Sequence, residues 1–472
     1  MGSLPFSPCI LIAALVSVLL FVFTTDASEI SEKPFRFSIL HDEQGYETAA
    51  RSAGPTVEDL GSFAGYVTLS GNTTKRMFYY LVRSRMKDQK NAPLIVSLTG
   101  GPGISASMTM FYECGPFRLN NDSSLVLNEF GWDTVADLLI IDSPMGTGFS
   151  YPTNDDDIPS TTEEAVGDLY DFLKRFFRNQ DYTDLVNNEL YLTGEGYAGH
   201  FIPALATRIL DGNKKNEFQM KLRGVSLGNP WLDGGRQFTS YPTYARQMKL
   251  ISSAQYNKTM IDAFSGCQRQ AKLACKGTKN KIDLAACAQV NIDCNDILWD
   301  FIIKPAGEKN YYDLRTNCTG VLCYYDFSIM EHFLNQASVK KALGVDPGAT
   351  FVTWSAAVNN SMAGDVMRDF TTDIPALLER GIKFLVYAGN YDLISNSIGI
   401  WGIIKGMTWS GGQHSFSPAR PLKVDGFKDA GRLRTSGPLT FVEVYNAGHM
   451  VPMDQPMVAL EMIKRFIKGN PL

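Results

Sequence analysis

Residues 189–200 of this chain read ELYLTGEGYAGH. The first four residues form a short, largely apolar run typical of a strand, and the glycine-rich stretch after it predicts a tight turn. Apolar residues then recur at helical spacing, at Ile202, Leu205, Ala206 and Ile209, so the turn leads into a helix. In open α/β sheets, ligand sites lie at the carboxyl ends of strands. The turn at 194–199 is therefore the first candidate for a functional site.

Short strands alternate with helices on both sides of this turn. Apolar runs, several of them near-continuous as in strands buried on both faces, lie at 94–98, 138–141, 189–192, 224–227, 384–387 and 440–444. Helices are predicted at 165–177 and 458–467. This alternation predicts an α/β fold with a doubly wound, mostly parallel sheet. A cysteine-rich window at about 235–344 breaks the rhythm and is predicted to be a mostly helical insertion.

The turn has the setting of a nucleophile elbow, the strained strand-to-helix turn with the pattern G-x-S-x-G, but Gly196 stands where the serine belongs. Two later strand ends carry an acid and a histidine, in the chain order expected of an α/β-hydrolase. Asp392 ends the sequence AGNYD, and His449 lies in NAGHMVP. A single aspartate after a strand is more often a turn residue, but the ordered set makes Asp392 and His449 candidates for acid and base.

Composition and the first residues indicate the compartment. The chain has 472 residues, 44% of them hydrophobic and 20% charged, with a net charge of −5 and both signs interleaved. This composition excludes a disordered protein, and the interleaved charges lack the basic patch typical of nucleic-acid-binding proteins. An apolar run at 10–23, followed by polar and small residues, predicts a cleaved signal peptide at 1–27. An uncleaved anchor is the alternative, because the run has no preceding Lys or Arg; no later stretch is apolar enough to span a membrane.

Cysteine usage agrees with secretion. Six of the eight cysteines lie in the 235–344 window, at Cys267, Cys275, Cys287, Cys294, Cys318 and Cys323. No CxxC pair occurs and no histidine lies among them, so disulfides are favoured over a zinc site, and their connectivity stays open. Glycosylation sequons that fit the secretory pathway lie at Asn72, Asn121, Asn257 and Asn359.

Six motifs in order give the chain a family resemblance. They are AGY at 64–66, TGGPG at 99–103, GTGFSY at 146–151, the turn at 194–199, the loop ending at Asp392, and GHM at 448–450. Together they resemble the plant-type serine carboxypeptidases. The resemblance implies an α/β-hydrolase fold over residues 60–472 with a helical, disulfide-bearing cap, a possible pro-segment at 28–59, and an extracellular, vacuolar or lysosome-like location. It also implies three disulfides, Cys267–Cys294, Cys275–Cys287 and Cys318–Cys323.

The same resemblance implies roles for individual residues. His449 would be the general base and Asp392 the acid that orients it, while backbone N–H groups of Gly101 and Tyr197 would form an oxyanion hole. Three residues would bind the free carboxylate of a peptide C-terminus: Thr99, Glu113 and Glu195. Two carboxyls can hold an anion only if protons are shared among them, so their pKa values are expected to rise and the site to favour acid pH. No metal or cofactor is implied.

Departures from the family pattern surround this predicted site. The usual W-L-[NT]-G-G-P-G-C-S-S reads SLTGGPGISA from residue 97, so Ser97 replaces a tryptophan and Ile104 replaces a cysteine. Trp354 stands where that cysteine's partner would be, and Ser395 replaces the cysteine after the acid. Cys114 is then an unpaired thiol, expected to be buried, with a reactive thiol as the alternative. The scattered changes favour a natural drift of the site over a deliberate knockout.

Three functions remain open. Glycine adopts the positive φ of an elbow residue without strain, so Gly196 could stabilise the fold while removing acyl-enzyme chemistry. The preferred interpretation is a catalytically impaired pseudoenzyme that retains binding of peptide or protein C-termini. The alternatives are a weak hydrolase in which His449 activates a water, and an active carboxypeptidase or related acyltransferase that uses another nucleophile such as Ser105. A homodimer is compatible with the resemblance.

Overall fold

A large mixed sheet organises the computed structural model, which describes residues 56–57, 60, 63–71, 75–86, 91–277, 282–318, 325–410 and 416–472. The sheet has 11 strands in the order β1-β2-β6-β3-β8-β9-β10-β13-β12-β11, with β7 paired to β2 outside this path. The central strands are parallel: β6 (Asp137–Ile141), β3 (Leu94–Leu98), β8 (Glu189–Glu195), β9 (Lys221–Gly228), β10 (Lys383–Gly389) and β13 (Leu439–Val444). The edges are antiparallel: β1 (Phe63–Thr68), β2 (Lys75–Val82) and β7 (Tyr151–Pro152) on one side, β12 (Gly431–Ser436) and β11 (Arg420–Pro421) on the other.

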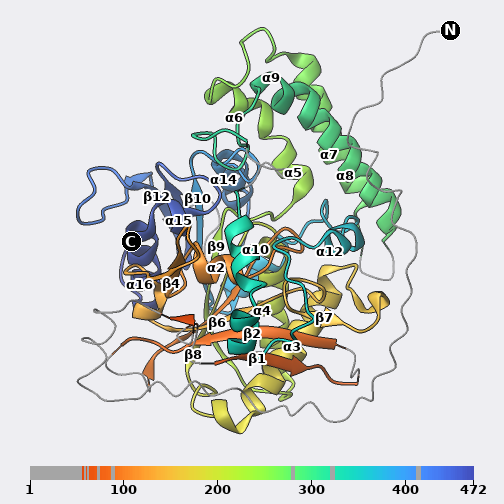
Figure 1. Cartoon of the computed structure of the whole chain (residues 1–472). Coiled ribbons are helices and arrows are strands. Elements are labelled where there is room, and N and C mark those ends of the chain that lie inside the picture. Colours follow the sequence, from red (N-terminus) through yellow and green to blue (C-terminus); the bar gives the residue numbers. More distant parts are fainter. Residues whose placement is uncertain are drawn as a thin grey trace, which may run out of the picture. The chain divides into compact units, whose positions relative to one another are not determined.

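The central strands confirm the predicted apolar runs, because both of their faces are covered. Along β10, Phe384 and Val386 belong to one hydrophobic cluster, whereas Leu385 and Tyr387 belong to the other. The first cluster is covered by α3 (Thr162–Arg178), α4 (Ala198–Lys214), α13 (Asp373–Glu379) and α14 (Ser397–Lys405). The second is covered by α2 (Ser107–Phe111), α10 (Ser328–Leu334), α11 (Ala337–Ala342), α15 (Val451–Asp454) and α16 (Pro456–Lys468). The doubly wound α/β fold is therefore confirmed (Figure 1).

Local sequence sets the ends of these helices. The side chain of Thr161 accepts a hydrogen bond from the Glu164 N–H at the start of α3. Glu163 and Glu164 lie in the first turn of that helix and Arg175 and Arg178 in the last, as the helix dipole favours. The predicted helix at 165–177 is thus extended at its N-terminus by a polar cap that hydrophobic periodicity does not reveal.

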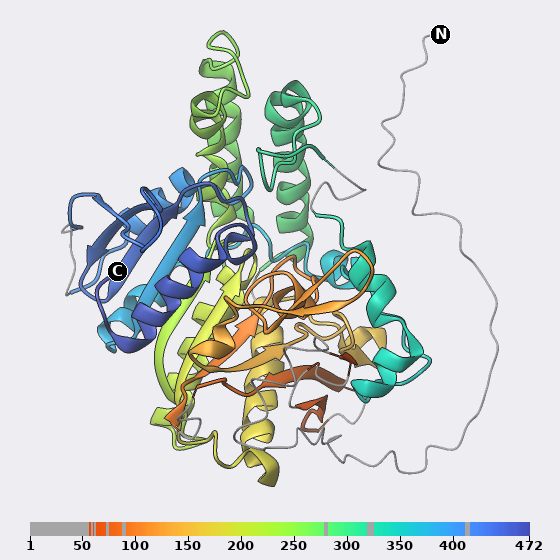
Figure 2. The same ribbon diagram turned by 60° about the vertical axis from the view of Figure 1, so that its left-hand side comes forward.

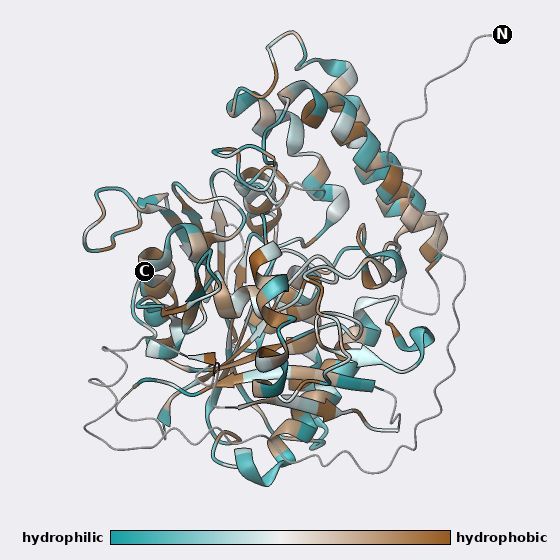
Figure 3. Cartoon of the chain, viewed as in Figure 1, coloured by the Kyte–Doolittle hydropathy of each residue, from teal (hydrophilic) through white to brown (hydrophobic). Residues whose placement is uncertain are grey.

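The insertion between β9 and β10 begins with a helical cap. It contains α5 (Gly234–Phe238), α6 (Tyr241–Gln247), α7 (Lys258–Ala274), α8 (Leu284–Leu298), a π-helical turn (Trp299–Ile303) and α9 (Lys304–Ala306). Figure 2 shows α7 and α8 projecting from one end of the sheet, and in Figure 3 hydrophilic and hydrophobic residues alternate along both helices. Disulfides Cys267–Cys294 and Cys275–Cys287 join the two helices as expected. Cys318 is also disulfide-bonded, but its predicted partner Cys323 lies outside the described residues.

The later part of the insertion returns to the main body. Phe333 of α10 packs edge-to-face on Phe111 of α2, with ring centroids 5.7 Å apart. The remaining elements are short: β4 (Phe117–Leu119), β5 (Leu125–Leu127), α12 (Ala356–Ser361), and 3-10 turns at Trp132–Thr134, Asp155–Asp157 and Gln180–Tyr182. Within the described residues, every helix is too short or too polar to cross a bilayer. The predicted signal peptide, most of the predicted pro-segment, and Asn72 lie outside those residues.

Candidate active site

The turn between β8 and α4 adopts the elbow geometry that its sequence predicts. Gly196 has a φ of 57°, a conformation that L side chains rarely adopt. Its N–H donates to the Gly228 carbonyl at 3.1 Å, and its carbonyl accepts from the Trp231 N–H at 2.8 Å. A Cβ on Gly194 would stand 2.6 Å from the Ala198 side chain, so strand and helix pack too closely there for a larger residue. The turn is therefore fixed by backbone bonds to Gly228, the last residue of the neighbouring strand β9, and to Trp231 just after it.

Asp392 and His449 meet at the carboxyl ends of β10 and β13. The His449 Nδ1 lies 2.6 Å from the Asp392 Oδ2, and both side chains are buried. Asn229 donates to the same carboxylate oxygen at 2.8 Å, and the Ser395 N–H donates to the other at 3.2 Å. A carboxylate accepts hydrogen bonds, so Nδ1 of the neutral imidazole carries the proton and Nε2 is left as the basic nitrogen. This is the orientation that a general base requires.

The basic face of His449 is turned toward Gly196. An ideal Cβ built on Gly196 would stand 2.9 Å from the His449 Nε2 and 3.4 Å from Cε1. The Glu195 Oε1 lies 3.9 Å from the same nitrogen. Sequence order thus correctly predicted that positions 196, 392 and 449 converge, although they come from three separate strands.

The loop that carries one predicted oxyanion group, Gly101, packs on the turn that carries the other, Tyr197, and both residues line one pocket. A Cβ on Gly100 would stand only 2.4 Å from the Tyr197 nitrogen, so the 99–103 loop packs directly on the elbow. In the described part of the chain, neither the Gly101 N–H nor the Tyr197 N–H donates to another protein group. Thr99 is close by, but its hydroxyl donates to the Ile104 carbonyl at 2.6 Å. The loop can thus offer two amides to a ligand, whereas the Thr99 hydroxyl is already engaged.

Glu113 and Glu195 form a buried acid pair beneath the turn. Burial raises the pKa of Glu195 well above its ordinary value, and the charge of Glu113 and a hydrogen bond to it raise it further. The Thr109 hydroxyl donates to Glu113 at 3.1 Å. The Oε1 atom of each carboxyl is buried and has no hydrogen-bond partner among the described residues. The pair is therefore equipped to share a proton and to receive a further polar group.

A small cavity of about 10 Å³ lies against this acid pair, lined by Ser97 and Cys114 among others. Cys114 is unpaired and buried, and burial raises the pKa of its thiol well above the ordinary value, so the buried alternative is the correct one.

Ile104 and Trp354 form an isolated antiparallel bridge. The positions expected to have lost a disulfide are therefore adjacent, as the family pattern implied.

A pocket of about 430 Å³ opens above the elbow between the sheet and the cap. Its floor contains Gly101, Glu195, Gly196 and His449, and its walls combine aromatic and aliphatic side chains with polar ones, among them the amides of Asn291 and Asn295. Asn359 also lines it, so one predicted glycosylation position lies at the pocket itself, whereas Asn121 and Asn257 are exposed elsewhere. Among the described residues, no cluster of His, Cys, Asp and Glu side chains is arranged to hold a metal.

The segment 311–315, in the later part of the insertion, contacts both loops of the Asp392–His449 pair, and no sequence pattern predicts this. The Tyr312 carbonyl accepts from the His449 N–H at 2.8 Å, and the Leu314 N–H donates to the Tyr391 carbonyl at 3.0 Å. Arg315 pairs with Asp313 and Asp454, each at 2.7 Å, and donates to the Asn446 carbonyl. We call residues 311–315 the clasp. The segment has neither periodicity nor a motif, so only the fold reveals it.

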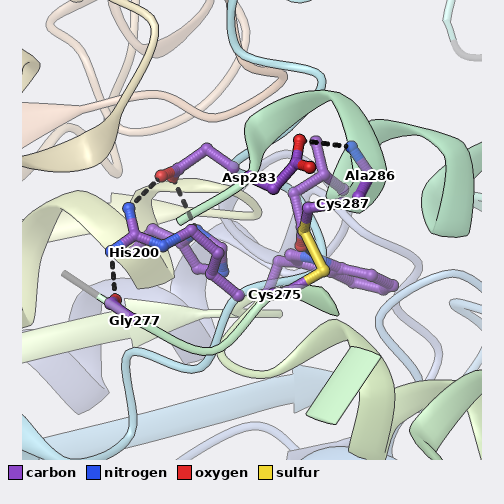
Figure 4. Close-up of a disulfide and its surroundings, with 10 residues drawn as sticks. His200, Cys275, Gly277, Asp283, Ala286 and Cys287 are labelled. Atoms are coloured by element: carbon purple, nitrogen blue, oxygen red, sulfur yellow. Dashed lines mark hydrogen bonds and ion pairs between the residues drawn. A yellow bond between two sulfur atoms is a disulfide. The ribbon is translucent and has the colours of Figure 1, made fainter. Parts of the chain in front are cut away.

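A second network holds Tyr197 from behind. The Asp365 Oδ2 accepts from the Tyr197 hydroxyl at 2.6 Å, and the His200 Nδ1 lies 3.5 Å from it. Arg368 pairs with Asp365 at 2.5 Å and reaches the Gly277 carbonyl at 3.5 Å, beside the Cys275–Cys287 disulfide (Figure 4). Nearby charges and hydrogen bonds keep the pKa of Asp365 below its ordinary value despite burial. Tyr197 was predicted, but four other site residues were not: His200, Asp365, Arg368 and Asn229. Asn229 follows β9, and a polar residue after a predicted strand could have identified it.

The sequence and the structure were compared with known protein families, proteins and solved structures, and all three comparisons match serine carboxypeptidases. Residues 54–469 match the family model described as serine carboxypeptidase. The chain is 44% identical over 422 residues to serine carboxypeptidase-like 47 of Arabidopsis thaliana, covering 89% of this chain and 81% of the relative. It is 45% identical over 418 residues to serine carboxypeptidase 3 of Oryza sativa subsp. japonica, covering 88% and 80%. The crystal structure of Kex1Δp, a prohormone-processing carboxypeptidase from Saccharomyces cerevisiae, superposes with a TM-score of 0.77 at 26% identity, covering 88% of this chain and 93% of that one.

Proposed function

The chain belongs to the serine carboxypeptidase family, and from this premise we propose that it is a catalytically impaired member that binds peptide C-termini. The single observation that carries the proposal is Gly196 at the elbow, opposite the basic nitrogen of His449. An acyl-enzyme requires an oxygen or sulfur nucleophile at that point, and glycine supplies none. In a serine hydrolase of another fold, loss of the nucleophile reduces kcat by about 10⁶.

Retention of binding is supported by the groups that remain. The acid pair of Glu113 and Glu195 can share a proton and hydrogen-bond to a carboxylate, and the raised pKa of Glu195 keeps it protonated to higher pH. Two backbone N–H groups, of Gly101 and Tyr197, are available at the same turn. A peptide C-terminus therefore has donors for its carboxylate and for its last carbonyl.

The alternative nucleophile Ser105 is disfavoured by its surroundings. Its side chain is fully buried and its hydroxyl donates to the Asp142 carboxylate at 2.6 Å. Ser105 does not line the pocket that contains Gly196 and His449. The active carboxypeptidase and the acyltransferase that would depend on it are therefore secondary to the binding function.

We infer that the protein passes through the secretory pathway. Disulfides Cys267–Cys294 and Cys275–Cys287 are typical of chains that fold in an oxidising compartment. Of an extracellular and a vacuolar destination, we favour the vacuolar one. Binding of a carboxylate requires a proton on the acid pair, which Glu195 with its raised pKa would hold, and an acidic lumen supplies that proton.

The deciding experiment compares the protein with its Gly196→Ser variant in hydrolysis of a blocked dipeptide at about pH 4–6. An inert parent and an active variant support the proposal, since only the nucleophile is then missing. Appreciable turnover by the parent contradicts it, and a fluorophosphonate probe then separates the two alternatives. Covalent labelling of the parent indicates another nucleophile, whereas turnover without labelling indicates a water activated by His449.

If both forms are folded and inert, peptide binding decides the proposal. Affinity for a peptide acid should exceed affinity for the same peptide as its C-terminal amide, because the amide cannot offer a carboxylate to the acid pair. Equal affinity, or no binding of either, contradicts a role in recognising C-termini.

A further inference from the structure

One predicted glycosylation sequon lies in the wall of the pocket above the elbow. Residues 359–361, Asn-Asn-Ser, end helix α12 and fit the Asn-X-Ser pattern that receives N-linked sugar. Asn359 is partly exposed and lines the pocket together with Gly196 and His449. Its side-chain amide makes no hydrogen bond to another described residue. The amide nitrogen is therefore free to carry a sugar, and a group attached to it lies at the pocket.

Helix α12 is attached to the 99–103 loop beside the elbow. The Ser355 N–H, at the start of the helix, donates to the Gly103 carbonyl at 2.8 Å. Val358 is fully buried, and an ideal Cβ on Gly103 would stand 3.1 Å from the Val358 Cβ, so helix and loop are in close contact. Asn359 follows Val358 directly. A sugar on Asn359 is thus held beside the site by the backbone and core contacts of its own helix.

The rest of the α12 surface leaves room for a bulky group. Ala356 and Asn360 are both exposed to solvent. The predicted glycosylation positions Asn121 and Asn257 are exposed as well, but neither lines the pocket. Of the predicted positions that the structure describes, only Asn359 would place a glycan at the pocket, and the other two serve as comparisons.

We propose that Asn359 carries an N-linked glycan that covers part of the pocket opening, and that this glycan admits flexible chain ends but excludes C-termini held close to a folded domain. The inference rests on the proposed passage through the secretory pathway and on the proposed binding of C-termini. In the transfer, the Asn359 amide nitrogen bonds to the anomeric carbon of a polyprenyl-diphosphate-linked oligosaccharide. The bond from that carbon to the diphosphate oxygen breaks, the amide nitrogen loses one proton, and the lipid diphosphate leaves.

A glycan at this position changes which ligands can enter. An N-linked sugar is bulky and hydrated, so it occupies space at the opening that a protein surface would need. The pocket volume of about 430 Å³ falls in the range of small-ligand sites, roughly 300–1,000 Å³, and holds only the end of a chain. The rest of the ligand must then pass the glycan, which an extended peptide can do and a compact domain cannot.

The first test is mass spectrometry of the full-length protein secreted from a eukaryotic host, before and after treatment with a peptide N-glycosidase. The peptide containing Asn359 should carry a glycan in the parent and none in Ser361→Ala or Asn359→Gln. Asn359→Gln keeps the Ser361 hydroxyl, which donates to the Pro159 carbonyl at 3.0 Å, so agreement between the two variants excludes an effect of that bond. An unmodified Asn359 in the secreted parent overturns the proposal.

The second test measures the cover over the pocket without any ligand. Trp299 lines the pocket and is 53% exposed, whereas Leu273 on the cap is 85% exposed and does not line it. In hydroxyl-radical footprinting, Trp299 should be oxidised at least about twofold faster in Ser361→Ala than in the parent, because the bulky glycan no longer shields it. Leu273 should be oxidised equally in both. Equal oxidation of Trp299 in the two proteins overturns the cover.

Thr259→Ala is the matched control for both tests. It removes the sequon at Asn257 but leaves the Asn257 side chain, which accepts from the Met260 N–H at 3.1 Å at the start of α7. Oxidation of Trp299 should be unchanged in this variant. A rise equal to that in Ser361→Ala would assign the effect to loss of sugar in general and overturn the role of Asn359.

The third test compares two ligands that end in the same sequence, acetyl-Ala-Ala-Ala-Ala and a folded lysozyme domain with four alanines appended to its C-terminus. At about pH 5 the peptide should associate with the parent at least about tenfold faster than the domain does, and removal of the glycan should abolish this difference. Equal rates in the parent overturn the exclusion of folded ligands. Absence of peptide binding by every form overturns the proposed function and the exclusion with it, whereas the first two tests still decide the glycan.

Discussion

The Nε2 atom of His449 lies 2.9 Å from the point that a Cβ atom on residue 196 would occupy. Real Cβ atoms essentially never approach another heavy atom this closely, so any side chain at 196 requires the imidazole to withdraw. His449 and its Asp392 partner are therefore arranged around a glycine. A serine introduced here gains a nearby base only after the ring shifts by a few tenths of an ångström.

The first prediction concerns the stability of the elbow. Gly196→Ala should lower the free energy of unfolding by about 1–3 kcal/mol, because a Cβ is strained at positive φ and crowds His449. Urea denaturation of both proteins measures the difference. Gly167→Ala is the control: Gly167 lies in α3 with open space around it, so alanine should stabilise by about 0.5–1 kcal/mol. A Gly196→Ala variant with the same free energy of unfolding as the parent would contradict the strained geometry.

The second prediction concerns pH. The native Glu195 carboxyl holds its proton to a higher pH than the unfolded chain, whose ordinary value is 4.5. Between these two pKa values the native state binds more protons, so stability falls as pH rises through that interval. Glu195→Gln removes this titration and should flatten the fall in the free energy of unfolding that the parent shows as pH rises above the ordinary value of 4.5.

Glu461→Gln provides the matched control for that measurement. Bonds to Arg465 and Lys464 hold the pKa of Glu461 below its ordinary value despite partial burial. Its contribution is lost as pH falls, so its removal should leave the slope above about pH 5 unchanged. Equal slopes for the parent and Glu195→Gln would show that the acid pair is not protonated in the native state.

The third prediction concerns the clasp. Arg315→Met removes the cation shared by Asp313 and Asp454 and leaves one buried and one partly buried carboxylate without it. We expect a loss of about 1–3 kcal/mol in stability and a changed NMR signal from the His449 ring, since the His449 loop loses these bonds. Arg223→Met breaks an ion pair in which both partners are about half exposed, and should cost at most about 1 kcal/mol without changing that signal. A His449 signal that is unchanged in Arg315→Met would reduce Arg315 to a purely structural role.

The fourth prediction concerns the unpaired thiol. Because Cys114 is buried and the pKa of its thiol is raised, it should resist iodoacetamide in the native protein at about pH 7.5 and react once the chain is unfolded. Mass spectrometry of the peptide containing Cys114 reports the modification. Rapid labelling of the native protein would mean that the small cavity beside Glu113 opens to solvent.

Much of the fold follows from apolar patterning. The run at 94–98 coincides with β3, and the glycines at 194 and 196 mark the elbow because packing and backbone conformation restrict the residue type there. Asp392 and His449 could be paired from chain order, since the carboxyl ends of parallel strands meet at one edge of a sheet. The disulfide pairings came from family resemblance alone, because spacing does not determine connectivity.

Other contacts could not be predicted because no local signal encodes them. The clasp bonds through backbone carbonyls and N–H groups, which every residue type possesses. The network of Tyr197, His200 and Asp365 joins Asp365 to two residues that lie 165 and 168 positions before it in the chain, and no local pattern marks this pairing. The π-helical turn at Trp299 also lacks a distinctive pattern, so its place in the pocket wall emerges only in three dimensions.

Because the clasp is bonded to the loops of both Asp392 and His449, we expect release of this segment and loss of the Asp392–His449 geometry to occur as one cooperative event. The amides of Leu314, Leu393 and His449 are tied to one another through the clasp. In native-state hydrogen exchange they should behave as one unit of local unfolding, exchanging together before the core amides of β8 and β10. The time for which the clasp stays bonded then sets the time for which the His449 ring keeps its orientation.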